Sequence, residues 1–236
     1  MEMRMRSRVV RIVVGVVASV ALIVGAIWLL TVLLPTRMPR YAGKPLEFWL
    51  EQRKSADAGA RQEAERLLND TVVPQLIDAA DHETDAAWRV GLVDALNALP
   101  GIDINFHNAR MRRMRAIYRL GLVGQGNNAV EAFLLRKLDD PTAGVKLIAA
   151  EALFTCKVSA NKLVPTLVTW LAAVSEDDDD ETIGIMSLLG RFGPAAKSAV
   201  PALTKRLSAR GKGVPETALK ALQQIAPETV VKVKIR

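Results

Sequence analysis

A short pattern of two apolar residues, a proline, one variable residue and a leucine recurs along this chain, and its repetition restricts the fold more than any other feature. It occurs around Pro74, Pro165 and Pro201, and a further copy carries Glu131 in place of the proline. The later three copies are 34 and 36 residues apart. A proline in the first turn of a helix loses no hydrogen bond, because its missing N–H would have no partner there. The recurring segments are therefore predicted to begin helices.

A second series of apolar residues marks the helices that precede these starts. Its members are leucines spaced 33, 36 and 33 residues apart, namely Leu120, Leu153, Leu189 and Leu222. Another apolar residue follows each leucine by three positions, namely Val123, Cys156, Phe192 and Ile225. Each unit is thus predicted to be a helix, a short turn and a second helix, with one apolar stripe on each helix. Neither helix can bury its stripe alone, so neighbouring pairs are predicted to stack.

Residues 188–207, LLGRFGPAAKSAVPALTKRL, resemble a HEAT repeat, particularly the short bacterial type related to the phycobilisome-lyase HEAT-like repeats. Residues 41–52, YAGKPLEFWLEQ, resemble the segment after the anchor in bacterial membrane-tethered HEAT proteins. The resemblance covers about residues 41–228. It implies an all-α fold, an α–α superhelix of the HEAT/armadillo-like solenoid type, preceded by one transmembrane helix. It also implies an interaction scaffold without catalysis.

The first half of the chain departs from the regular repeat. Leu68 lies only six residues before Pro74, which predicts a shortened turn in the first helical hairpin. An extra apolar helix is predicted over about residues 85–99, before Pro100 and Gly101. Regular stacking is therefore not predicted for this part.

The N-terminal segment predicts a membrane anchor. Residues 12–34 are 23 residues without a charge, and a helix of that length reaches roughly 34 Å, enough to cross a hydrocarbon core of about 30 Å. The apolar region of a cleaved signal peptide is shorter, about 7–15 residues, and leads to a small-residue cleavage site that is missing here. The predicted organisation is a basic cytoplasmic tail (1–11), the transmembrane helix (12–34), a linker (35–44), the solenoid (45–228) and a C-terminal tail (229–236).

The orientation of the anchor follows from the basic residues on either side. Four arginines lie in the 11 residues before the span, whereas Arg37, Arg40 and Lys44 follow it, so the tail is predicted inside and the repeats outside the cytoplasm. The chain is thus predicted to be a single-pass protein of the bacterial inner membrane. The small residues Gly15 and Ser19 would let two anchors pack closely, and the alternative of a self-associating structural envelope protein stays open.

Charge and cysteine content exclude several classes of function. Of the net charge of +7, the first 34 residues carry +3, and the rest is an ordinary mixed-charge surface without the basic stripe of a nucleic-acid-binding protein. Cys156 is the single cysteine, so there is no internal disulfide framework and no cysteine-rich zinc site. We expect no cofactor, no metal site and no catalytic residue.

Three groups of residues suggest chemistry but are predicted to be structural. Cys156 occupies a core position of the repeat and is predicted to be a buried small side chain; the alternative is a reactive thiol of a lyase-like enzyme or lyase chaperone. His82 and His107 are predicted to be polar loop residues. The acidic run 176–181 lacks the ligand spacing of an EF-hand and is predicted to be a solvated turn whose last acids begin a helix.

The helix predicted over about residues 108–120 carries the candidate partner-binding residues Arg112, Arg115 and Arg119 on one stripe. The opposite arc is predicted to hold the apolar residues Met111, Met114, Ile117, Tyr118 and Leu120. The stripe is either a solvated face or a docking surface for an acidic partner or lipid headgroups. The leading hypothesis is a membrane-tethered scaffold that binds a protein partner. The sequence leaves open the identity of that partner and the oligomeric state of the scaffold.

Overall fold

The computed structural model describes residue 25 and residues 39–101, 108–175 and 178–229. Apart from one pair of two-residue strands, the regular structure of these residues is helical, so the all-α prediction is confirmed. Except for Gly25, the predicted anchor at residues 12–34 lies outside the described residues. Within the described ranges, no helix combines the length and the apolar character needed to cross a membrane.

The chain divides into two units. Residues 40–84 and 109–236 form the larger unit, called the array below. The smaller unit comprises residues 1–39 and 85–108, and its described part contains helix α5 (Ala87–Asn97). The helix predicted over about residues 85–99 is therefore present.

The array begins with a small hairpin joined to a helix. Strand β1 (Arg40–Tyr41) pairs antiparallel with β2 (Lys44–Pro45), and helix α2 (Leu46–Gln52) follows directly. The indole N–H of Trp49 donates to the carbonyl oxygen of Tyr41 at 2.8 Å, and both residues are buried. This contact holds the hairpin on α2, so the predicted linker at 35–44 is regular structure from Arg40 onward.

Helices α3 (Ala58–Leu67) and α4 (Val73–His82) are joined by a π-helical turn, η1 (Leu68–Val72), and the shortened turn predicted before Pro74 is wrong. Proline cannot donate to the helical ladder, and its ring crowds the carbonyl four residues earlier. A π-turn widens the ladder just before the proline and lets the helix continue. Leu68 and Val72 are buried by this arrangement.

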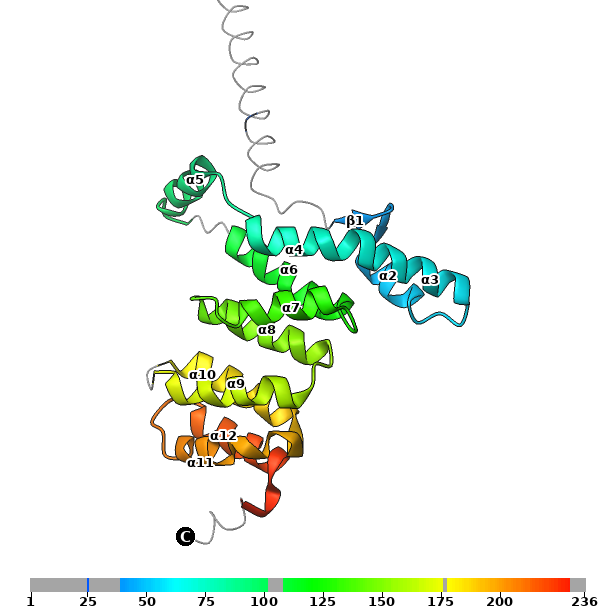
Figure 1. Cartoon of the computed structure of the whole chain (residues 1–236). Coiled ribbons are helices and arrows are strands. Elements are labelled where there is room, and N and C mark those ends of the chain that lie inside the picture. The colour runs from blue at the N-terminus through cyan, green and yellow to red at the C-terminus, as the bar shows by residue number, and fades with distance from the viewer. Residues whose placement is uncertain (1–24, 26–38, 102–107, 176–177, 230–236) are drawn as a thin grey trace, which may run out of the picture. The chain divides into compact units, whose positions relative to one another are not determined.

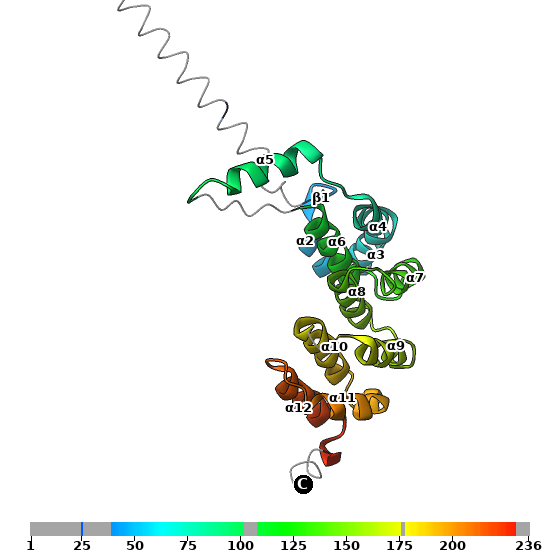
Figure 2. The same cartoon turned by 90° about the vertical axis from the view of Figure 1, so that its left-hand side faces the viewer.

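The described residues from Ala109 to Ile225 form seven further α-helices and one 3-10 helix. They are α6 (Ala109–Val123), α7 (Asn128–Lys137), α8 (Ala143–Thr155), α9 (Ala160–Ala173), α10 (Asp179–Arg191), the 3-10 helix η2 (Gly193–Ala199), α11 (Val200–Arg206) and α12 (Val214–Ile225). In one layer α6, α8, α10 and α12 each pack against the next, and α4, α7, α9 and α11 form the other layer (Figures 1 and 2).

The repeat leucines occupy the core of the first layer, as the spacing predicts. Leu120, Leu153, Leu189 and Leu222 are each 0% exposed. Glycines beside two of them allow close packing: a methyl group added at Gly121 would lie 2.8 Å from the Ala152 Cα, and one at Gly190 would lie 3.2 Å from the Ala221 Cα. Small residues therefore set the spacing between α6 and α8 and between α10 and α12.

The helix start predicted at Pro165 is wrong. Helix α9 begins at Ala160, so Pro165 lies inside it rather than in its first turn. The five added residues contribute the buried side chains of Leu163 and Val164, while Pro165 faces solvent. Burial of the two apolar residues offsets the one hydrogen bond that the proline removes. Pro201, by contrast, does lie in the first turn of α11.

Candidate interaction surface on helix α6

Helix α6 is held in the array by a stripe of small and apolar side chains. It packs against α4 and α8, and its buried residues are Ala109, Ala116, Ile117, Leu120, Gly121 and Val123. Alanine and glycine let the neighbouring helices approach closely. Four residues of the helix are exposed, namely Arg110, Met111, Arg115 and Tyr118.

The accessible side of α6 carries two large apolar residues with an arginine between them. Met111 is 49% and Tyr118 is 55% exposed, and Arg115 is also exposed. Steps of four and three residues place the three side chains on one helix face, which we call the α6 face. The prediction that Met111 and Tyr118 lie opposite Arg115, toward the core, is therefore wrong.

The side chain of Arg112 contacts the end of helix α4 instead of extending into solvent. Its guanidinium forms an ion pair with Glu83 and donates to the Thr84 carbonyl oxygen at 3.1 Å. Glu83 and Thr84 follow the last turn of α4, so this charge-assisted contact joins the end of α4 to the side of α6. Arg112 thus has a structural role, whereas Arg115 is exposed.

Arg119 is half-buried near the hairpin at the start of the array. Burial raises the pKa of the Tyr41 phenol, the charge of Arg119 lowers that pKa, and Glu47 raises it. The three arginines predicted as one stripe therefore differ: Arg115 is exposed, Arg119 lies beside Tyr41, and Arg112 is paired.

Two other arginines have structural roles that the sequence did not reveal. Arg53 donates from Nη1 to the Val123 carbonyl and from Nη2 to the Leu122 carbonyl, both at 3.0 Å, and so caps the C-terminus of α6. Arg206 caps α9 in the same way, with Nη2 at 2.8 Å from the Leu171 carbonyl oxygen. Positive charge is favourable at a helix C-terminus. No local pattern marks either residue, because its partners are tens of residues away.

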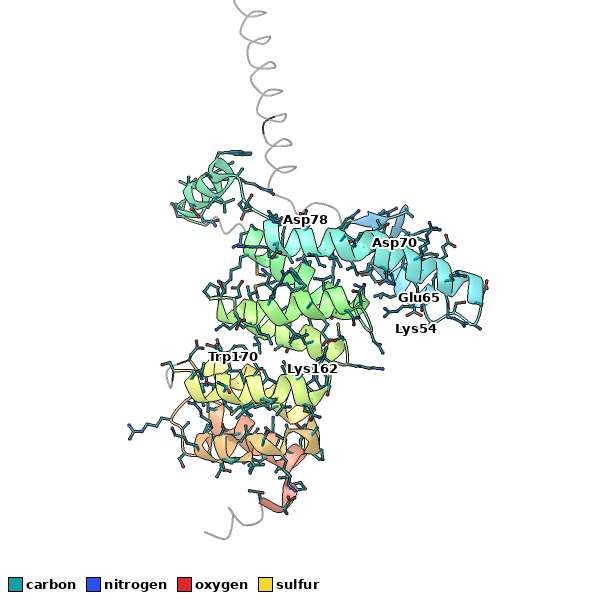
Figure 3. All side chains as sticks on the ribbon, viewed as in Figure 1. Lys54, Glu65, Asp70, Asp78, Lys162 and Trp170 are labelled. Atoms are coloured by element: carbon teal, nitrogen blue, oxygen red, sulfur yellow. The ribbon has the colours of Figure 1, made fainter. Side chains whose placement is uncertain are left out.

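The described part of the acidic run forms the start of α10, as predicted. Asp178 accepts from the Glu181 N–H at 3.1 Å, and Asp179 accepts from the Lys212 N–H at 2.9 Å. Trp170 on α9, labelled in Figure 3, donates its indole N–H to Glu181 at 2.5 Å. These carboxylates hold helix starts and neighbouring segments together.

His82 is exposed on the last turn of α4. Its Nδ1 lies 2.9 Å from Oδ1 of Asp78, which Figure 3 labels. His107 lies outside the described residues. Among residues 39–101, 108–175 and 178–229, no group of three or more His, Cys, Asp or Glu side chains is placed to hold a metal ion.

Cys156 is buried, with 6% exposure, as its repeat position predicts. Its Sγ lies 3.5 Å from the Gly121 carbonyl oxygen. Burial raises the pKa of the thiol to about 11; the carboxylate of Glu131 also raises it, and the charge of Arg53 lowers it. The neutral thiol is therefore the form that fits this core position.

Thiol labelling tests this assignment. At pH 8 roughly one folded thiol in a thousand is ionised, so native labelling is expected to be on the order of a hundred-fold slower than labelling in urea. Between pH 9 and 11 the native rate should keep rising while the denatured rate levels off. Fast native labelling at pH 8 would contradict a core role and favour the lyase-like alternative.

A scan against protein-family models finds no family that matches this chain, and a search of curated proteins finds no matching sequence.

Proposed function

We propose that this protein is a membrane-tethered scaffold: residues 12–34 anchor it, the array is a HEAT/armadillo-like solenoid outside the cytoplasm, and the α6 face binds a protein partner. The observation that carries the binding proposal is the exposure of Met111 and Tyr118 on either side of Arg115. Methionine, tyrosine and arginine are the residue types enriched at protein interfaces.

The distribution of exposed apolar side chains supports this choice of surface. Among the described residues of the array, the large apolar side chains that are exposed are Phe48, Met111 and Tyr118. The described residues of helices α7 to α12 contribute none. Two of these three residues, Met111 and Tyr118, lie on one face of α6, within two turns of each other.

The charge around the α6 face indicates the chemistry of the partner. Arg110 and Arg115 are exposed, and Arg113 is half-exposed, on a helix without acidic residues. A complementary surface would present carboxylates around an apolar contact. Such charges accelerate association and make it sensitive to salt.

Site-specific photo-crosslinking tests the proposal in cells that carry the full chain. A photoreactive phenylalanine analogue at position 118 should give an adduct with a partner protein, whereas the same analogue at exposed Lys220 on α12 should not. Arg115→Glu should lower the adduct yield about ten-fold or more. The matched charge reversal Lys220→Glu should leave the yield unchanged.

Stability measurements separate binding from folding. Arg115→Glu should change the free energy of unfolding by no more than about 0.5 kcal/mol, because the side chain is exposed. Arg112→Glu should lower that free energy, because it replaces the ion pair with Glu83 by a repulsion. Equal adduct yields in Arg115→Glu and Lys220→Glu would exclude a contribution of Arg115 to docking, and the lack of any adduct from position 118 would exclude the α6 face as the docking surface. An adduct between two copies of this chain would favour the envelope-protein alternative.

A further inference from the structure

Two of the three junctions between α6, α8, α10 and α12 are close backbone contacts. At each of them, the glycine that follows a repeat leucine meets the alanine that precedes the next repeat leucine. The pairs are Gly121 with Ala152 between α6 and α8, and Gly190 with Ala221 between α10 and α12. A methyl group at either glycine would come within 3.2 Å of a backbone atom of the facing helix. These helices therefore meet backbone against backbone.

The middle junction, between α8 and α10, carries large side chains at the equivalent positions. Phe154 is the residue after its repeat leucine, and Leu188 is the residue before the next one. A phenylalanine and a leucine therefore lie where the other two junctions have glycine and alanine. The repeat leucines are also 36 residues apart across this junction and 33 across each of the other two. We call this junction the joint.

The ends of side chains make contacts across the joint. The ring of Phe154 meets the ring of Phe192 edge to face, with centroids 4.8 Å apart. The Arg191 guanidinium lies 4.2 Å from the centre of the Phe154 ring. Toward the other end of the two helices, Leu147 of α8 lies over Gly184 of α10. Such contacts adjust by small rotations of the side chains, which the backbone contacts of the flanking junctions cannot do.

Polar contacts differ in the same way. On one side of the joint Arg53 joins the end of α2 to the end of α6, and on the other Arg206 joins α11 to the end of α9, each through two carbonyl oxygens. Across the joint, Lys162 of α9, labelled in Figure 3, pairs with Glu131 of α7 at 2.6 Å. The side chain of Lys162 is 61% exposed, and an exposed ion pair contributes no more than about 1 kcal/mol.

We propose that the joint is a hinge at which the array changes its curvature. Residues 40–84 and 109–155 form one rigid block, and residues 160–229 form the other. Rocking two packed helices brings some of their atoms closer together. At the flanking junctions these would be backbone atoms that are already in contact, whereas at the joint they are the ends of side chains. The angle between the two blocks is therefore the one that changes most easily.

The contacts at the joint set the size of the motion. An aromatic pair stays attractive at centroid distances of up to about 7 Å, and a cation stays attracted to a ring within about 6 Å. The rings of Phe154 and Phe192 can therefore separate by about 2 Å from their distance of 4.8 Å. This opening is smaller than a water molecule, about 2.8 Å across, so buried Leu188 stays dry.

An opening of this size changes the shape of the array measurably. About 2 Å across one helix spacing of about 9 Å is a rotation of roughly 10–15°. At a distance of about 20 Å from the joint, two helix spacings away, such a rotation moves a residue by about 4 Å. Distances between the blocks should therefore vary, while distances within each block stay fixed.

Spin labels test the hinge on the full chain in detergent. Nitroxides are attached to cysteines that replace exposed residues, namely Gln62 on α3, Ala132 on α7, Asn161 on α9 and Lys205 on α11. Brief labelling leaves Cys156 unmodified, because it is buried. The pair 62–205 spans the joint, whereas the pairs 62–132 and 161–205 lie within single blocks. In pulsed dipolar spectroscopy the spanning pair should give a distance distribution about 4 Å broader than either internal pair. Equal widths for the three pairs overturn the hinge.

A matched pair of variants locates the motion. Lys162→Ala removes the ion pair that crosses the joint and should broaden the 62–205 distribution further. Lys137→Ala removes a 2.6 Å ion pair with Asp81, which lies inside the first block, and should leave that distribution unchanged. Equal broadening by both variants would place the motion inside the first block and overturn the proposal. Should Lys162→Ala fail to fold, the comparison of the three label pairs still decides, because it leaves the joint intact.

Discussion

Leu153→Ala is expected to lower the free energy of unfolding of the array by about 2–5 kcal/mol. Leu153 is 0% exposed on α8, which lies between α6 and α10. The substitution removes buried methyl groups and leaves a cavity that two flanking helices cannot both close. Urea denaturation of the full chain in detergent, followed by circular dichroism at 222 nm, measures the change.

An exposed leucine that lies two residues after the end of α5 serves as the control. Leu99 is 51% exposed, so Leu99→Ala should cost no more than about 0.5 kcal/mol. Leu153→Met should cost less than about 1.5 kcal/mol, because it nearly conserves volume. Equal losses for Leu153→Ala and Leu99→Ala would contradict the assignment of the repeat leucines to the core.

Gly121→Val is expected to destabilise the array by about 3 kcal/mol, at the upper end of the range for overpacking. A methyl group at this position would lie 2.8 Å from the Ala152 Cα and 3.0 Å from its Cβ. The first of these atoms belongs to the backbone, which cannot rotate away as a long side chain can. Helices α6 and α8 must therefore separate, and Ile117 and Leu120 lose part of their packing. Thermal unfolding should show a lowered transition temperature.

Three further variants define the cause. Gly121→Ala should cost less than Gly121→Val, because a methyl group is smaller than an isopropyl group. In addition, alanine favours the helix by about 1 kcal/mol relative to glycine, which offsets part of the clash. Gly91→Ala makes the same change on α5, where a methyl group meets no atom within 4 Å, and should be neutral or slightly stabilising. In the Gly121→Ala background, Ala152→Gly should recover only part of the loss, because the clash with the backbone of α8 remains. Full tolerance of Gly121→Val would show that the two helices are farther apart.

The stacked helix pairs could be predicted because the apolar residues that become buried recur along the chain with a regular period. The four repeat leucines stand at matching positions of α6, α8, α10 and α12. Each can be identified from the spacing of apolar residues within its own helix. Helix α7 begins where its repeat copy predicts, since the Asn127 side chain accepts from the Ala129 and Val130 N–H groups. These signals are local, so they are visible in sequence.

The candidate site was only partly predictable. The sequence indicated α6 and its arginines, but it placed Met111 and Tyr118 on the core side. The small residues Ala116 and Gly121 are buried where α6 packs against α4 and α8, and hydrophobicity alone did not select them over Met111 and Tyr118. Arg112 likewise differs from Arg115 only because Glu83 reaches it from the end of α4.

The amino-acid pattern was thus sufficient for the helical class, the repeat positions and the buried state of Cys156, because each depends on periodic burial within one helix. The π-turn before Pro74 and the early start of α9 depended on which apolar residues neighbouring helices could cover. The separate roles of the α6 arginines, and the capping of α6 by Arg53, depended on contacts between residues about 30 to 70 positions apart. Such contacts exist only after the helices have packed, and so they leave no local trace in the chain.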